Sequence, residues 1–299
     1  MSEPERHHFL PQFYLKRWDN SEGKIETYSR RRGQIHIKSY VAKGVAYERG
    51  LYSLEGAPAK KRNSIEREFM GPVVDDPAAK ALRLMLREDE GEFTIERRVA
   101  WTRFLMSLLV RLPPLLSKIE ADGDAALISE MERAPEEYEA LRKPGDPLTP
   151  QEFLSVRGLD WVLNNFGRSL IPGLIENPRM TKDIAHMHWI VLRYGAGPYG
   201  FVTSDFPICM HPGLAHQNCL ISLPLSPTAL FLAAHDVELL NQLRALPPAT
   251  VINAANKIVI KSAERFVYAD DRQYRGLVDT YLRPEPPRQT SGPTSVHSC

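Results

Sequence analysis

Cysteines, long apolar runs and net charge are all scarce in this chain of 299 residues. Its cysteines are Cys209, Cys219 and Cys299, an odd number without CxxC spacing, which argues against a disulfide framework and a cysteine-built zinc site. Every apolar stretch is broken by arginine or proline before it reaches membrane-spanning length, and the first residues show no signal-peptide pattern. We therefore expect a cytoplasmic protein that spans no membrane.

The formal net charge is +1, which excludes a molecule drawn as a whole to nucleic acid or to an anionic membrane. Charge is nevertheless segregated along the chain. Residues 1–62 contain 13 Lys and Arg against 7 Asp and Glu, whereas residues 63–143 contain 12 against 17. Any attraction to a polyanion must therefore come from a local patch in the basic N-terminal region.

The hydrophobic period divides the chain into three regions. Residues 7–62 are β-rich and basic, and their alternation predicts a hairpin that turns at Arg30–Gln34. Residues 63–180 have a helical period, with a break at Gly71–Pro72 and a central helix that is apolar nearly all round. Residues 181–282 return to antiparallel strands, with closing helices packed beside them.

These regions together predict one α+β domain over residues 7–282, in which a helical layer packs against the C-terminal strands. Residues 1–6 are expected to be a flexible start. Residues 283–299 are rich in Pro, Ser, Thr and Gly and are expected to be a disordered tail.

The segment His7–Trp18 concentrates more groups able to coordinate, stack or exchange protons than any other stretch. His7 and His8 titrate near neutral pH, which makes them candidate general bases or metal ligands. Gln12 and Tyr14 are candidate binding groups beside them. The alternative is an anchor without chemistry, in which aromatic and apolar side chains fix the terminus in the core; its members are Phe13, Leu15 and Trp18.

Arg111 lies on the buried side of the predicted central helix, and a buried guanidinium needs a partner. Glu66 is a candidate for that partner, in a pair that is either structural or binds a carboxylate or phosphate of a substrate. Alternatively, Arg111 covers the C-terminus of its helix. Glu66 in turn fits a capping box that starts at Asn63.

Ser204 and Asp205 end a predicted strand in the segment Thr203–Pro207. Asp205 is a candidate ligand or general base, and the alternative is a turn held by side-chain bonds to neighbouring backbone. Ser204 lies outside a GxSxG elbow, which argues against a hydrolase nucleophile. His186 and His188 would share one strand face at a spacing that some metal sites use, or would belong to a polar sheet face.

The hairpin turn carries a run of three arginines, Arg30, Arg31 and Arg32. Together with nearby aromatic side chains, such a basic tip is suited to tracking a phosphate backbone and stacking on bases. The alternative is a solvated turn without a partner.

With these positions marked, the chain resembles the bacterial family numbered 4238 among the domains of unknown function. The resemblance rests on the following segments: His7–Leu15, the helix at Ile65-Glu66, Arg111-Leu112-Pro113, Thr203–Pro207, Pro224–Pro227 and Asn253. It implies that these positions form a site, with Asn253 among the binding residues, but it implies no reaction. The chain departs from the family pattern at Phe206, where Asn is common, and at Leu112, where a small polar residue is usual.

The first functional hypothesis is a hydrolase or nuclease that acts on a phosphate-bearing substrate. His7 or His8 would be the base or a metal ligand, Asp205 a carboxylate ligand and Arg111 the anion clamp. The alternatives are a non-catalytic module that binds nucleic acid or protein through the hairpin, and a small-molecule sensor. The sequence identifies no cofactor and no metal; its candidate partners are nucleic acid and a phosphorylated ligand.

Overall fold

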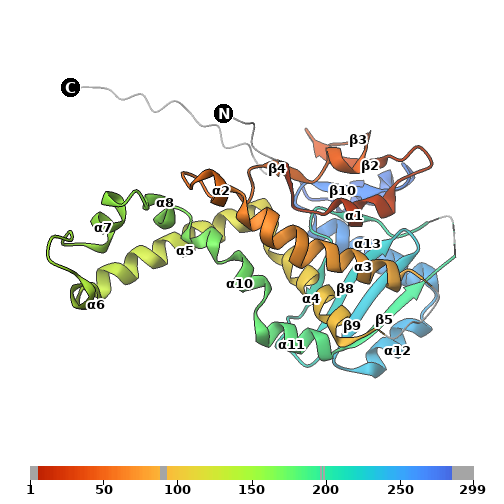
Figure 1. Ribbon diagram of the computed structural model, residues 1–299. Coiled ribbons are helices and arrows are strands. Elements are labelled where there is room, and N and C mark those ends of the chain that lie inside the picture. The colour runs from red at the N-terminus through yellow and green to blue at the C-terminus, as the bar shows by residue number, and fades with distance from the viewer. Residues whose placement is uncertain (1–5, 88–92, 196, 198, 285–299) are drawn as a thin grey trace.

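Antiparallel sheets and packed helices form the α+β fold of this chain, seen in a computed structural model (Figure 1). The structure describes residues 6–87, 93–195, 197 and 199–284. The predicted flexible start and disordered tail fall almost entirely on residues 1–5 and 285–299, outside the described residues.

The predicted N-terminal hairpin forms, and a strand from the far end of the chain joins it. Strands β2 (Ile25–Arg31) and β3 (Gln34–Tyr40) pair antiparallel, and the sheet order is β3-β2-β10-β6. Strand β10 is Phe266–Ala269 and β6 is Thr203–Ser204. Arg32 and Gly33 have φ values of 50° and 79°, the two positive values that a two-residue type I′ turn requires. The alternation of apolar residues and the type I′ turn therefore specify the same pairing of β2 with β3.

This hairpin sheet has two different faces. Tyr28 and Val267 point to one face, where they pack in a cluster with helices α13 (Pro248–Ser262) and α14 (Arg275–Tyr281). Thr27 lies opposite Tyr268 in the ladder, so both point to the other face. That second face is turned toward the short ribbon of β1 (Arg6–His8) and β4 (Tyr47–Arg49).

The second sheet is buried on both faces and has the order β5-β9-β8-β7. Phe231 of β9 packs in the main core with the central helix α4, while Leu230 and Leu232 pack in a separate cluster with α12 and α13. A strand covered on both sides needs apolar residues at every position, and β9 is buried throughout. The bounds are β5 His188–Arg193, β7 Cys209–His211, β8 Leu220–Ser226, β9 Ala229–Ala234 and α12 Val237–Ala245.

The helical region predicted from residue 63 onward is observed, with two corrections near its start. A π-helix, η3 (Ile65–Asp75), runs directly into α3 (Asp76–Met85). The predicted break at Gly71–Pro72 is therefore wrong, because Pro72 lies inside the π-helix. The wider π-helical turn accommodates the proline ring, which in an α-helix clashes with the carbonyl one turn earlier. The N-cap residue is Ser64 rather than the predicted Asn63, whose Oδ1 accepts from the hydroxyl of Ser53 at 2.7 Å.

The central helix α4 (Ile95–Val110) ends at a sharp corner. Leu112 is extended because it precedes Pro113, and α5 (Pro113–Arg133) then starts with two prolines. Within the described residues no single helix has the length and apolar composition to cross a membrane; α4 and α5 pass that test only together, bent by 82°.

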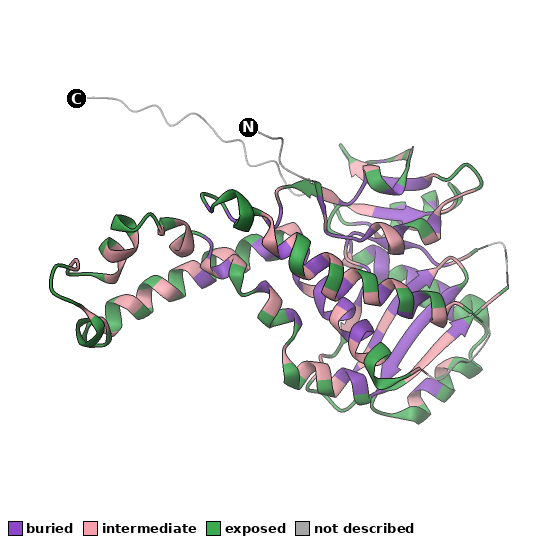
Figure 2. Cartoon of the chain, viewed as in Figure 1, coloured by how far each residue is buried: buried purple, intermediate pink, exposed green. Residues whose placement is uncertain are grey.

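Helix α5 projects from the body as the core of an arm (Figure 1), and Figure 2 shows that the arm is mostly exposed or half-buried. The base of the arm is held where α9 crosses α5. Gly167 lies so close to α5 that a Cβ there would be 2.4 Å from the carbonyl oxygen of Glu120. Arg168 bonds the Glu120 carboxylate at 2.6 Å across the same crossing. The helices of the arm and its return are α6 Pro135–Leu141, α7 Pro150–Val156, α8 Asp160–Leu163, α9 Phe166–Ser169, α10 Ile171–Ile175 and α11 Pro178–His186.

The remaining short elements complete the N-terminal region. They are α1 Gln12–Leu15, the 3₁₀ turns η1 Lys16–Trp18 and η2 Ala42–Gly44, and α2 Ala59–Arg62.

We predict that Gly167→Ala lowers the free energy of unfolding by about 1 to 3 kcal/mol, because the added methyl group overpacks the crossing of α5 and α9. Urea denaturation measures the effect. Gly173→Ala in α10 is the matched control, since a Cβ there meets nothing within 4 Å, and it should change stability by about 1 kcal/mol or less. Equal effects of the two substitutions would contradict the close crossing.

Candidate functional site

The candidate site is a cavity of about 640 Å³ against the open face of the hairpin sheet. Its floor is the face that carries Thr27 and Tyr268. The β1–β4 ribbon forms a second wall through Phe9 and Tyr47, and the corner between α4 and α5 forms a third through Leu112. Three of the segments on which the family resemblance rests thus each supply part of the wall: Phe9, Leu112 and Asp205.

The lining combines aromatic rings with charges of both signs. Five aromatic side chains surround the space: Phe9, Tyr40, Tyr47, Phe266 and Tyr268. The charged lining groups are two guanidiniums and three carboxylates: Arg31, Arg265, Glu48, Asp205 and Glu264. Such a mixture of flat apolar walls and a few charged groups is characteristic of sites for small organic ligands.

Asp205 ties one wall of the cavity to the turn between α13 and β10. One carboxylate oxygen accepts from the backbone N–H of Glu264 at 2.9 Å, and the other accepts from Arg265 at 2.8 Å and Phe266 at 2.9 Å. Burial raises the pKa of Asp205 to about 6, although these three N–H bonds favour the ionised form. The carboxylate therefore fixes the position of Arg265 and Phe266 in the cavity wall.

The rest of the Thr203–Pro207 segment is also engaged in structure. Ser204 is buried, and its Oγ accepts from the backbone N–H of Phe206 at 3.3 Å. Thr203 Oγ1 lies 2.8 Å from the hydroxyl of Tyr14, which also donates to the carbonyl of Pro224. Trp18 donates from its indole nitrogen to the carbonyl of Phe201 at 3.0 Å. The aromatic members of the opening segment therefore anchor the N-terminus to strands near the C-terminus.

His7 and His8 belong to strand β1 of the ribbon and are not among the described residues that line the cavity. His7 is fully buried, its Nδ1 accepts from the backbone N–H of Tyr52 at 2.9 Å, and the two rings are stacked. Burial lowers the pKa of His8, opposed by a hydrogen bond with the backbone of Lys43. An imidazole with a lowered pKa is neutral at physiological pH, and His8 lies beside Tyr47, which does line the cavity.

Arg111 is buried, as predicted, but its hydrogen-bonded carboxylate is Asp75 rather than Glu66. Its guanidinium bonds the two oxygens of Asp75 at 2.6 and 3.3 Å. Asp75 ends the π-helix, and the unbroken run from η3 to α3 brings it beside Arg111. Glu66 adds to the electrostatic field around Arg111 and around the buried hydroxyl of Tyr52. The pair fixes the corner whose next residue, Leu112, lines the cavity.

Two further predicted binding residues lie apart from the cavity lining. Gln12 opens α1 and is partly exposed, and its side chain makes no hydrogen bond to a described residue. Asn253 is exposed on α13. The buried asparagine of that helix is Asn256, which accepts from the backbone N–H of Val202 and donates to the carbonyl of Gly200, both at 2.9 Å.

The three arginines of the hairpin divide among different surroundings. Arg30 points to the packed face, where it bonds Asp279 of α14 at 2.8 Å. Arg31 points to the opposite face and lines the cavity. Arg32 is exposed in the turn. Successive side chains of a strand point to opposite faces of the sheet, so the three consecutive arginines do not form one basic patch.

No metal-binding cluster of three or more His, Cys, Asp or Glu side chains occurs within the described part of the chain. His186 is the last residue of α11 and lies 2.7 Å from the carbonyl of Lys182, whereas β5 begins at His188. The predicted shared strand face for these two imidazoles is therefore wrong.

Sequence reasoning missed Arg265, Tyr40 and Tyr268 as lining residues. No local pattern marks Arg265 and Tyr268, because their role follows from the pairing of β10 with β2. The alternation of the hairpin does contain the signal for Tyr40, which pairs with Ile25 two positions from Thr27 on the same face.

We predict that Asp75→Asn lowers the free energy of unfolding by about 3 kcal/mol or more, because it leaves the buried Arg111 guanidinium without its counter-charge. Chemical denaturation tests this. Glu139→Gln, which breaks the pair with Arg142 on an exposed helix, is the control and should cost less than about 0.5 kcal/mol. A loss below 1 kcal/mol for Asp75→Asn, on the order of an exposed pair, would contradict the assignment.

The Asp205 carboxyl should titrate near pH 6, against an ordinary value of 3.8. Between these values the folded protein holds a proton that the unfolded chain has released. The contribution of Asp205 to stability therefore decreases as pH rises from about 4 to about 6, by up to roughly 3 kcal/mol, and is constant above that window. NMR of the side-chain carboxyl carbon gives the midpoint directly, and a midpoint below pH 4 would show that the N–H bonds outweigh burial.

Comparison with known proteins gives one family. No curated protein and no solved structure matches the chain significantly. The family described as "Protein of unknown function (DUF4238)" matches residues 6–273, nearly the whole chain, which agrees with the resemblance noted from its motifs. The chain therefore belongs to the DUF4238 family of proteins of unknown function.

Proposed function

We propose that this protein binds a nucleotide in the cavity on the hairpin sheet. The observation that carries the proposal is the composition of a 640 Å³ space that is lined by five aromatic residues and two arginines. The volume lies within the range of small-molecule sites, about 300 to 1,000 Å³. The proposal develops the small-molecule alternative and keeps the phosphorylated ligand as partner.

The rings and the arginines suit the two halves of a nucleotide. Tyr40, Tyr47 and Phe266 come from three different strands and offer flat surfaces on which a base stacks. Arg31 and Arg265 supply the charge-assisted hydrogen bonds that a phosphate takes. Arg31 makes no ion pair with any described residue, so its guanidinium is open to a ligand.

Three carboxylates in the lining limit how much negative charge the ligand can bring. Asp205 has a pKa of about 6, so it gains a proton as pH falls toward 5 and the cavity becomes more positive. The three carboxylates favour a monophosphate over a triphosphate, and protonation of Asp205 favours tighter binding at mildly acidic pH.

Asp205 also gives hydrolysis of the bound phosphate ester a physical basis. It lines the cavity, and a pKa of about 6 suits proton transfer near neutral pH. Both of its oxygens accept backbone N–H bonds, so catalysis requires that one of them be released. Hydrolase or nuclease activity remains a narrower prediction within the binding proposal, with Asp205 rather than His7 or His8 at the reacting group.

We predict that Arg31→Ala and Arg265→Ala each weaken the binding of nucleoside monophosphates about 10-fold or more, because each removes a charge-assisted contact to the phosphate. Isothermal titration calorimetry with AMP, GMP, CMP and UMP measures the affinities. Arg32→Ala is the matched control, since Arg32 is exposed in the same hairpin and outside the described lining, and its affinity should equal that of the unaltered protein.

Absence of binding by all four monophosphates at millimolar concentration would overturn the proposed function. Equal losses for Arg31→Ala and Arg32→Ala would show that the hairpin attracts phosphate through general charge rather than through the cavity.

A further inference from the structure

A second, smaller hollow adjoins the cavity at the end of the hairpin sheet. It measures about 30 Å³, and it shares Arg31, Glu264, Arg265 and Phe266 with the cavity. Arg283 lines the hollow but is not among the residues that line the cavity. The hollow and the cavity therefore adjoin, and the residues that they share define a path along the surface from the cavity to Arg283.

The hollow carries more positive than negative charge. Arg31 and Arg283 make no ion pair with a described residue, and Glu264 is the carboxylate that shares this lining with them. Arg30 also borders the hollow, but its charge is balanced by Asp279 at 2.8 Å. Since the chain as a whole has a net charge of +1, this attraction for an anion is local.

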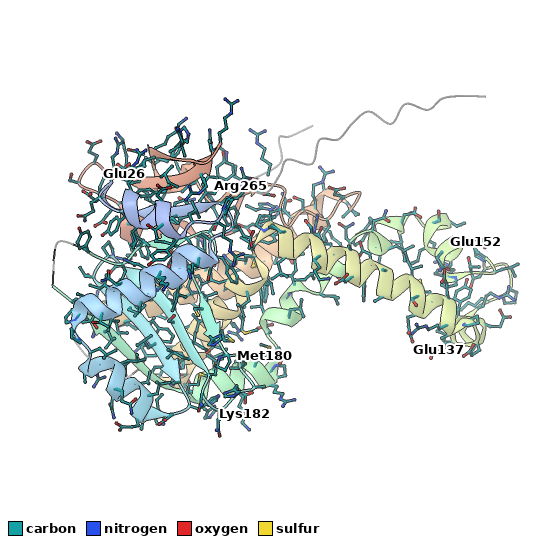
Figure 3. The ribbon with its side chains drawn as sticks, turned by 180° about the vertical axis from the view of Figure 1, so that it is seen from behind. Glu26, Glu137, Glu152, Met180, Lys182 and Arg265 are labelled. Atoms are coloured by element: carbon teal, nitrogen blue, oxygen red, sulfur yellow. The ribbon has the colours of Figure 1, made fainter. Side chains whose placement is uncertain are left out.

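The arginines gather at one end of the hairpin sheet. Arg31 ends β2, Arg265 directly precedes the neighbouring strand β10, and both line the hollow together with Arg283. The carbonyl of Leu282, beside Arg283, accepts from Arg30 Nε at 3.2 Å, which holds this part of the chain against β2. Figure 3 shows Arg265 at the end of the hairpin sheet that is nearer the arm, with Glu26 toward the other end.

Phe266 connects the two spaces. Its ring belongs to the lining of both, and the Arg265 guanidinium lies over it, 5.2 Å from the ring centre. A stacking surface beside a row of guanidiniums is the arrangement by which proteins hold single-stranded nucleic acid.

We propose that the ligand is one end of a single-stranded nucleic acid, with its terminal nucleotide in the cavity and the following phosphates on Arg265 and Arg283. This inference rests on the proposed function and adds the substrate class to it. A duplex does not fit the same description, because its bases are paired along their edges and stacked on their neighbours, which keeps a single base from entering the cavity. The path also explains why the basic side chains extend past the cavity, where a mononucleotide would not reach.

Fluorescence anisotropy with end-labelled oligo(dT) and oligo(U) of one to six nucleotides tests the inference. Affinity should rise about 10-fold or more from one to three nucleotides and then level off, because the path holds few phosphates beyond the cavity. Comparison of the two series shows whether the ligand is DNA or RNA. Arg283→Ala should remove most of the gain with length and lower the slope of log affinity against log salt by about 1. Arg32→Ala is the control and should retain both.

The outcomes separate the two proposals. If mononucleotides bind and longer strands bind no tighter, the inference is overturned and the proposed function stands. If a duplex of the same length binds as tightly as the single strand, the backbone alone is recognised and the inference is again overturned. If neither mononucleotides nor oligonucleotides bind, the proposed function itself fails.

Discussion

The pairing of β10 with β2 is the constraint on which the rest of the structure depends. It joins the two ends of the chain in one sheet and places Phe266 opposite Ser29 and Tyr268 opposite Thr27. Because side chains alternate across a strand, this single register sends Val267 to the packed face and Arg31 to the cavity. A slip of β10 by one residue would turn Val267 toward the cavity and Tyr268 toward the packed face.

The residues that mark the family act mainly as supports for this arrangement. Asp205 holds the backbone of the turn that carries Arg265, and the Arg111–Asp75 pair holds the corner that presents Leu112. Tyr14 ties the N-terminal segment to β6 and β8 through its hydroxyl. These residues therefore position the walls of the cavity, and Asp205 and Leu112 also line it, together with residues from across the sheet. A motif search alone would miss Arg265 and Tyr268, which line the same cavity.

The sequence predicted the elements better than the site. Alternation located the hairpin and its turn, and the predicted apolar central helix is observed as α4. The helix break predicted at Pro72 is wrong, because a π-helix accommodates a proline that the geometry of an α-helix excludes. Glu66 was a candidate partner for Arg111, and it does act on the charge of Arg111, but the hydrogen-bonded carboxylate is Asp75, at the end of the π-helix. The lining residues Arg265 and Tyr268 could not be predicted, because strand pairing between distant segments leaves no local signal.

The most direct test of the account is a crystal structure of the protein with AMP. The account predicts that the base stacks between tyrosine and phenylalanine rings of β3, β4 and β10, with the phosphate in hydrogen-bonding contact with Arg31 or Arg265. A nucleotide bound elsewhere on the chain, or an empty cavity at saturating AMP, would contradict the claim that this cavity is the functional site.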